Sequence, residues 1–215
     1  MPRPADLRQL LAIVDQAYDR RSWHGTNLRG SIRSVSAKRA AWRPAPRRHN
    51  IWELAVHAAY WKYAVRRRLT GEARRSFPLK GSNWFTRPID TSEGAWEADV
   101  ALLDETHRSL RETVVNLPAS RLHRRLGESQ ETCFSVISGV AAHDLYHAGQ
   151  IQLLKVLSSE KGDLRMISEI ASTRLLHGVW HRKLRQVERP ERSGKDRIAP
   201  AIVGGRKTHL RVAER

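Results

Sequence analysis

The stretch Ala142-His143-Asp144-Leu145-Tyr146-His147-Ala148-Gly149-Gln150-Ile151 carries two histidines four residues apart. On a helix, residues with this spacing lie on one face and their side chains meet. Apolar positions around the stretch recur at alternating intervals of three and four residues, and both histidines fall on this repeat: Cys133, Val136, Val140, His143, His147, Gln150, Leu154 and Leu157. The sequence therefore predicts a helix over about residues 132–157 whose two histidines face the core.

A second helical segment places another histidine on an apolar face. Asn50 is a good N-cap, and Glu53 follows three residues later in a pattern that resembles a capping box. We expect this helix to run from Ile51 to about Thr70 and to end at Gly71. His57 stands on its stripe where an apolar residue is expected. Three imidazoles from two helices are thus directed into one core.

Two further amphipathic segments indicate an all-α protein. One covers Ala5 to Ser22, and the other is capped by Thr91 or Ser92 and ends before Pro118. Residues 71–91 are rich in Gly, Pro, Ser and basic residues and are interpreted as a loop. No sustained two-residue alternation indicates a strand. Four long helices with one apolar stripe each favour a four-helix bundle.

The composition fits one globular domain with a C-terminal extension. The chain has 215 residues, of which 40% are hydrophobic, and one cysteine. These values exclude an intramolecular disulfide framework and fit a cytoplasmic protein. No apolar run approaches the length of a membrane span, so we expect no membrane association. We expect the bundle over residues 1–160, an extra helix over 161–185 and a basic, disordered tail over 186–215.

Three neutral imidazoles that converge in a core are suited to bind a divalent metal ion. A buried imidazole must form a hydrogen bond or bind an ion to offset its lost hydration. We therefore expect His57, His143 and His147 to ligate a metal and to leave positions open for water or substrate. Nitrogen ligands favour zinc, nickel, copper or iron over magnesium or calcium.

Alternative interpretations of the histidines stay open. Each of the three is alternatively a core histidine with one hydrogen bond and no metal. His107 lies on the apolar stripe of the third helix, and it is either a fourth ligand or a core residue. His24 lies in the Trp-His-Gly break after the first helix, from which its side chain would reach the rim of the site. The remaining histidines fall near caps, in loops or in the tail, and we expect them to be exposed: His49, His123, His177, His181 and His209.

Two carboxylates are candidate catalytic residues because of their place in the sequence. Glu53 lies one turn before His57, and Asp144 is adjacent to His143. Either would orient an imidazole or act as a base toward a metal-bound water. Glu53 alternatively only completes the helix cap. Motifs typical of serine hydrolases, P-loop proteins, dinucleotide-binding proteins and H-E-x-x-H metalloproteases are absent.

The formal net charge of +17 suggests an alternative function. A strongly basic chain is typical of proteins that bind nucleic acid or another polyanion. The alternative is therefore a basic nucleic-acid-binding or regulatory protein without catalysis. The simpler interpretation of the charge is that basic residues line solvated helix faces.

The sequence resembles the DinB family of the DinB/YfiT-like superfamily. The resemblance rests on the segments 49–63 and 143–151, together with Trp23-His24-Gly25 and Trp42-Arg43-Pro44, and it covers about residues 5–158. It implies a four-helix bundle of up-down-down-up topology that is commonly dimeric. It also implies a metal triad at His57, His143 and His147, with zinc or nickel as the usual ion.

The resemblance also implies a class of reaction. Characterised relatives include transferases of low-molecular-weight thiols and a thiol-dependent isomerase. We therefore expect a cytoplasmic, metal-dependent enzyme that is transferase-like or hydrolase-like. Its expected partners are a small-molecule substrate, such as a low-molecular-weight thiol, and a second copy of the chain.

Overall fold

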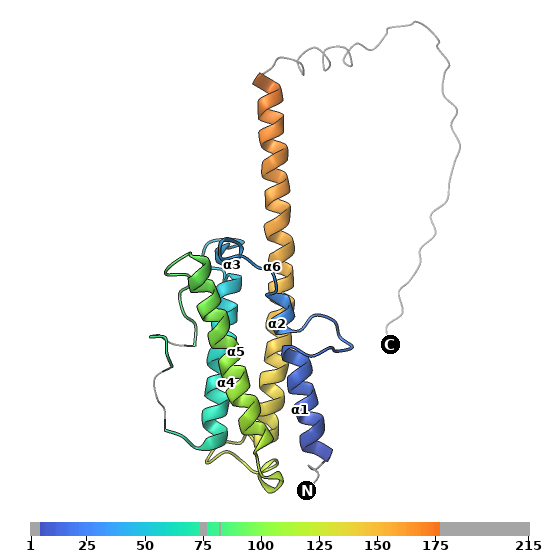
Figure 1. Cartoon of the computed structure of the whole chain (residues 1–215), viewed down its shortest axis with the longest axis vertical. Helices are drawn as coiled ribbons and strands as arrows, with labels where there is room; N and C mark the ends of the chain where they lie inside the picture. Colours follow the sequence, from blue (N-terminus) through green and yellow to red (C-terminus); the bar gives the residue numbers. More distant parts are fainter. Residues whose placement is uncertain (1–4, 74–76, 82, 177–215) are drawn as a thin grey trace, which may run out of the picture. The chain divides into compact units, whose positions relative to one another are not determined.

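Every regular element in the described part of the computed structural model is a helix (Figure 1). The structure describes residues 5–73, 77–81 and 83–176. The elements are α1 (Ala5–Tyr18), α2 (Leu28–Ser31), α3 (Ala37–Ala41), α4 (Ile51–Thr70), α5 (Glu93–Val115), a 3-10 turn (Ala119–Arg121) and α6 (Cys133–Leu176). The predicted all-α helical bundle is confirmed, and the up-down-down-up order of its helices stays a prediction.

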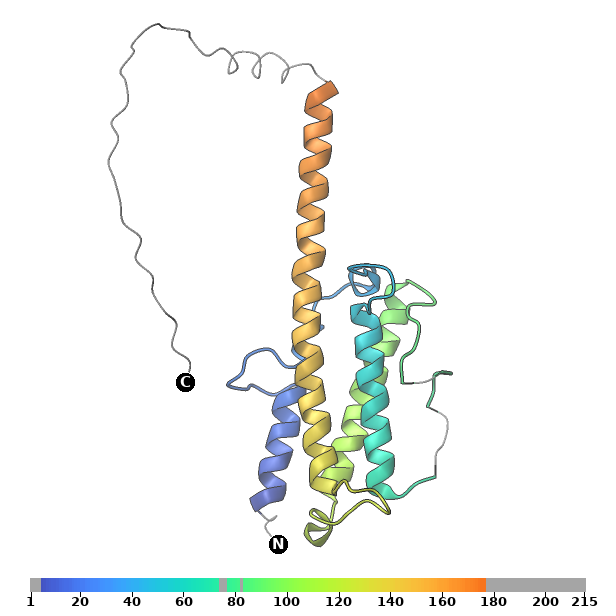
Figure 2. The same ribbon diagram turned by 180° about the vertical axis from the view of Figure 1, so that it is seen from behind.

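The helix α4 is the most completely buried element and explains where the core lies. Both views place it beside α5 (Figures 1 and 2). Its residues Trp52 and Val56 are almost inaccessible to solvent, and they belong to a core cluster that includes Leu103 of α5. A second cluster joins α1 to α6 through Leu10 and Ile137. The one histidine of α4, His57, is therefore buried rather than exposed to water.

The helix α4 begins after Asn50, which forms the N-cap that the sequence predicts. The Asn50 side chain accepts a hydrogen bond from the backbone N–H of Glu53 at 2.8 Å, and its amide donates to the Arg87 carbonyl at 2.8 Å. Gly71 ends the helix in the left-handed region, at φ +75°, which favours glycine. Asn50 thus both begins α4 and ties it to the loop that contains Arg87.

Replacing Asn50 by alanine is expected to lower the free energy of unfolding by about 2 kcal/mol. The loss combines a missing cap with the shorter of the two hydrogen bonds to the Arg87 carbonyl, which also accepts from Arg43 at 3.2 Å. Urea unfolding followed by circular dichroism measures it. The matched control is Ser92→Ala, which removes the exposed cap of α5 and an exposed hydrogen bond to Asp90. A loss for Asn50→Ala no larger than that of Ser92→Ala would contradict the double role of Asn50.

The last helix is longer than its apolar repeat predicts. The expected end is near Leu157, but α6 continues to Leu176, so residues 161–176 extend α6 instead of forming a separate helix. The physical reason is that Gly162 costs a helix only about 1 kcal/mol relative to alanine, which does not stop it. Contact density divides the chain into Met1–Ile167 and Ser168–Arg215. The rest of the expected extra helix and the tail over 186–215 lie outside the described residues.

A membrane span is not found in the described part of the chain, where no helix is both long and apolar enough to cross a bilayer.

Candidate metal centre

Three histidine side chains converge between α4 and α6. The Nε2 atom of His143 lies 3.2 Å from Nε2 of His57 and 3.0 Å from Nε2 of His147. One ligand atom from each residue lies within 4.8 Å of the other two. The structure therefore brings together the three side chains that the sequence places on two apolar faces.

Two of the rings have defined tautomers. Nδ1 of His57 lies 2.7 Å from the carbonyl oxygen of Asn83, and because a carbonyl only accepts, Nδ1 must carry the hydrogen. Nδ1 of His147 likewise donates to Oε1 of Gln150 at 2.7 Å. In their neutral forms both rings therefore present the lone pair of Nε2 to the centre.

Hydrogen bonds alone cannot satisfy the nitrogen atoms of the three imidazoles, and His143 is the reason. Its Nδ1 is buried and has no hydrogen-bond partner among the described residues. If Nδ1 carries the hydrogen, three lone pairs face one another. If Nε2 carries it, one hydrogen serves two acceptors. In either case a lone pair at the centre lacks a donor, which is costly in a buried site.

The spacing of the three nitrogens fits a metal ion. Zinc–nitrogen bonds of about 2.05 Å at tetrahedral angles place ligand nitrogens about 3.3 Å apart. The observed separations of 3.0 and 3.2 Å are close to that value. The donor set and its geometry therefore fit a divalent metal centre with room for a further ligand.

Burial keeps the imidazoles in the form that binds metals. Burial lowers the pKa of His57 to about 4 and the pKa of His143 to about 3. It also lowers the pKa of His147, although the hydrogen bond to Gln150 opposes this. All three rings are consequently neutral near pH 7, with lone pairs ready for coordination.

Tryptophan rings pack around the cluster. Trp84 stacks on His57 at a centroid distance of 3.7 Å and on His49 at 3.7 Å, so it lies between two imidazoles. Trp61 of α4 meets the rings of His57 and His143 edge-on. Sequence reasoning assigns residues 71–91 to a loop and misses that Asn83 and Trp84 complete the site. The one signal in the sequence is the aromatic pair Trp84-Phe85, which a purely solvated loop would not need.

The two candidate carboxylates lie outside the cluster, since neither belongs to the set of groups that could share an ion. The Glu53 carboxylate accepts hydrogen bonds from Arg43 and faces His49 at 3.1 Å. Burial alone would raise the pKa of Glu53, but these partners lower it. Asp144 pairs with Lys62 in full burial. Both carboxylates therefore hold cations of the chain.

The other histidines are placed away from the centre. His107 is buried and stacks on Tyr18 at 3.6 Å, so of its two open interpretations the structure supports a core residue. His24, His49 and His123 are exposed, although His49 also packs on Trp84. Cys133 is buried on α6 and is not part of the cluster. The last three histidines lie outside the described residues: His177, His181 and His209.

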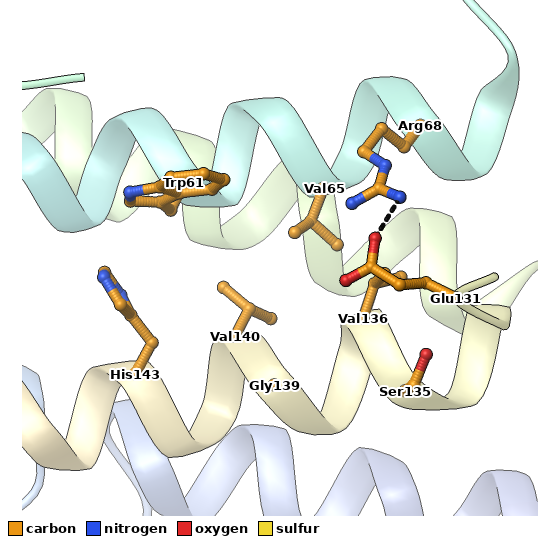
Figure 3. Close-up of a pocket in the computed structure, with 9 residues that line it drawn as sticks. All are labelled: Trp61, Val65, Arg68, Glu131, Ser135, Val136, Gly139, Val140 and His143. Atoms are coloured by element: carbon orange, nitrogen blue, oxygen red, sulfur yellow. Dashed lines mark hydrogen bonds and ion pairs between the residues drawn. The ribbon is translucent and has the colours of Figure 1, made fainter. Parts of the chain in front are cut away.

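Two pockets reach the cluster. His143 lines a groove between α4 and α6 (Figure 3), with a volume of about 220 Å³. His147 lines a pocket of about 600 Å³ on the side of His49, Trp84 and Tyr146. Small molecules therefore have access to the imidazoles along two routes.

Replacing Gln150 by leucine is expected to weaken zinc binding about 10- to 100-fold. The variant removes the acceptor that fixes the His147 ring and its tautomer. Competition with a chromophoric chelator measures the affinity. Gln152→Leu is the matched control, because Gln152 lies on the same helix and donates to Thr26 instead. Equal zinc affinities for the two variants would show that Gln150 does not orient a ligand.

Comparison with known families agrees with this geometry. The family model described as the DinB superfamily matches residues 20–151, a span that contains all three histidines of the cluster. No curated protein and no solved structure gives a significant match.

Proposed function

The chain belongs to the DinB superfamily, and from this premise we propose that it is an enzyme that uses a divalent metal, zinc or nickel, held by His57, His143 and His147. The observation that carries the proposal is the convergence of three imidazole nitrogens within 4.8 Å. An i,i+4 histidine pair alone also occurs in helices that bind no metal, but a third ring from another helix with a fixed tautomer favours coordination.

The bound ion would supply Lewis-acid chemistry, which lowers the pKa of a thiol or a water that it coordinates. The chain supplies the surroundings. The carbonyl of Asn83 and the side chain of Gln150 hold two rings with Nε2 toward the centre. Trp61 and Trp84 pack against the imidazoles and limit the water that reaches them. Three protein ligands leave a coordination position for the reactant.

A transfer reaction on a low-molecular-weight thiol is the proposed chemistry, with hydrolysis as the second choice. The two pockets at His143 and His147 support transfer, because they give separate approaches for a thiol and for its acceptor. Hydrolysis needs only one organic reactant besides water. We propose that the protein acts in the cytoplasm.

Glu53 and Asp144 enter this proposal as positioning residues. Each is buried and engaged by a cation of the chain, Arg43 or Lys62. A general base must reach the proton that it abstracts. The carboxylates that hold Arg43 and Lys62 instead fix the helices that carry the histidines.

Cobalt(II) substitution tests the thiol proposal. Adding 2-mercaptoethanol to the cobalt-loaded protein is expected to produce a sulfur-to-cobalt charge-transfer band in the near ultraviolet. The same titration of His143→Ala should give no band. Cobalt binding without any spectral change at saturating thiol would overturn the thiol proposal while leaving the metal centre intact.

The charge-based alternative stays a prediction. Many arginines of the described bundle are engaged in ion pairs, such as Arg29 with Asp104 and Arg111 with Asp15. These pairs place some of the arginines without a polyanion, but the net charge of +17 is the excess of basic over acidic residues and is not removed by them. Nucleic-acid binding and a homodimer likewise stay predictions from the sequence.

A further inference from the structure

The groove that His143 lines has a defined shape and two different ends. We call it the α4–α6 groove. Its lining residues are Trp61, Val65, Arg68, Glu131, Ser135, Val136, Gly139, Val140 and His143. Figure 3 shows Trp61 and His143 at one end, Arg68 and Glu131 at the other, and valines between them. The groove therefore joins the metal centre to an ion pair.

The length of the groove follows from its helices. Trp61 and Arg68 are seven residues apart on α4, which corresponds to about 10 Å along the axis. The walls between them are apolar, since Val65, Val136 and Val140 supply them. A ligand that fills this space has an apolar body about 10 Å long.

The far end of the groove is suited to an anion. Arg68 donates to the Glu131 carboxylate, and the two side chains are 30% and 55% exposed. Glu131 precedes α6 and is held by Arg68 and Ser129. An exposed ion pair adds little stability, so a ligand carboxylate can replace Glu131 at Arg68 at small cost. Arginine binds carboxylates through two parallel hydrogen bonds, which favours this exchange.

Gly139 keeps the groove open. It lies inside α6, where glycine costs about 1 kcal/mol relative to alanine. A Cβ built on it would meet nothing within 4 Å, so close packing does not account for the glycine. A larger side chain at this position would occupy the groove itself. Gly139 therefore lowers the stability of α6 slightly but leaves room for a ligand in the groove.

We propose that the α4–α6 groove binds an elongated apolar carboxylate, with its carboxylate at Arg68 and its other end beside His143. The inference rests on the proposed function and deepens it by naming the substrate class of the same site. The carboxylate and the apolar body contact only the chain, so binding of this class does not require the metal.

Octanoate binding to the metal-free protein, measured by calorimetry, tests the proposal. Gly139→Leu is expected to abolish binding, and Arg68→Met to weaken it about 10- to 100-fold. Glu131→Gln should strengthen it about two- to fivefold, because it removes the competing carboxylate. Gly149→Leu is the matched control, since Gly149 lies on the same helix, is exposed and also has nothing within 4 Å of its Cβ position.

Two results would overturn the proposal. One is octanoate binding by Gly139→Leu equal to that of the parent protein. The other is octylamine binding as tightly as octanoate, which would show that Arg68 does not select the charge. Retained zinc binding with either result would remove only the groove proposal. Normal octanoate binding in a protein that binds no metal would remove only the metal centre.

Discussion

A His143→Ala protein is expected to contain almost no bound metal, whereas the parent protein should bind about one divalent ion per chain. His143 is the ring whose Nε2 lies within 3.2 Å of both other ligand atoms, so its loss leaves two nitrogens and an empty position. Loss of a residue that only hydrogen-bonds a metal ligand weakens metal binding by up to about 100-fold. Loss of a ligand itself should therefore weaken binding by at least about 100-fold. Elemental analysis after loading with zinc and desalting measures the content.

The control for this experiment is His123→Ala. His123 is exposed and lies near Asp6, away from the cluster. The substitution removes one imidazole from the chain without touching the proposed centre, so the metal content should match that of the parent. Equal metal content in His143→Ala and His123→Ala would remove the claim that the three histidines hold the ion.

Replacing Lys62 by methionine is expected to lower the free energy of unfolding by about 3–5 kcal/mol. Lys62 and Asp144 are almost completely buried, with side-chain exposures of 1% and 3%. Burial lowers the pKa of Lys62 and raises the pKa of Asp144, while their mutual attraction opposes both changes. Removing one partner leaves the other uncompensated in the core, which is far more costly than losing an exposed pair. Urea unfolding of the metal-free protein measures the change.

A second substitution separates the pair from simple packing. In the double variant Lys62→Met with Asp144→Asn no charge remains at either position, and we expect it to recover about half of the loss or more. A single variant within about 1 kcal/mol of the parent would contradict the importance of this pair. A double variant as unstable as the single one would show that the loss of stability comes from the packing of the Lys62 side chain and not from an unpaired charge.

The sequence was sufficient to predict the helices that carry the three clustered histidines. Asn50 caps α4 and Ser92 caps α5, because caps depend on residues a few positions apart. His57, His143 and His147 lie on apolar faces, so helical periodicity alone directs them inward. Patterns among residues a few positions apart are therefore enough to identify the three candidate ligands.

What the sequence did not reveal depends on contacts between distant residues. Lys62 and Asp144 are 82 positions apart, and each is of a type that is rarely buried, so no local pattern pairs them. The acceptor for His57 is the backbone carbonyl of Asn83, and any residue type offers a carbonyl. Glu53 fits a capping pattern but pairs with Arg43, because the turn before α4 brings the guanidinium close. Tertiary packing decided each of these contacts.

The X-ray absorption spectrum of the zinc-loaded protein tests the central claim most directly. We predict a metal shell dominated by about three imidazole nitrogens at about 2.0–2.1 Å, with the outer-ring scattering that imidazoles produce and without protein sulfur. A shell without multiple imidazoles, or zinc that does not stay bound, would contradict a metal centre formed by His57, His143 and His147.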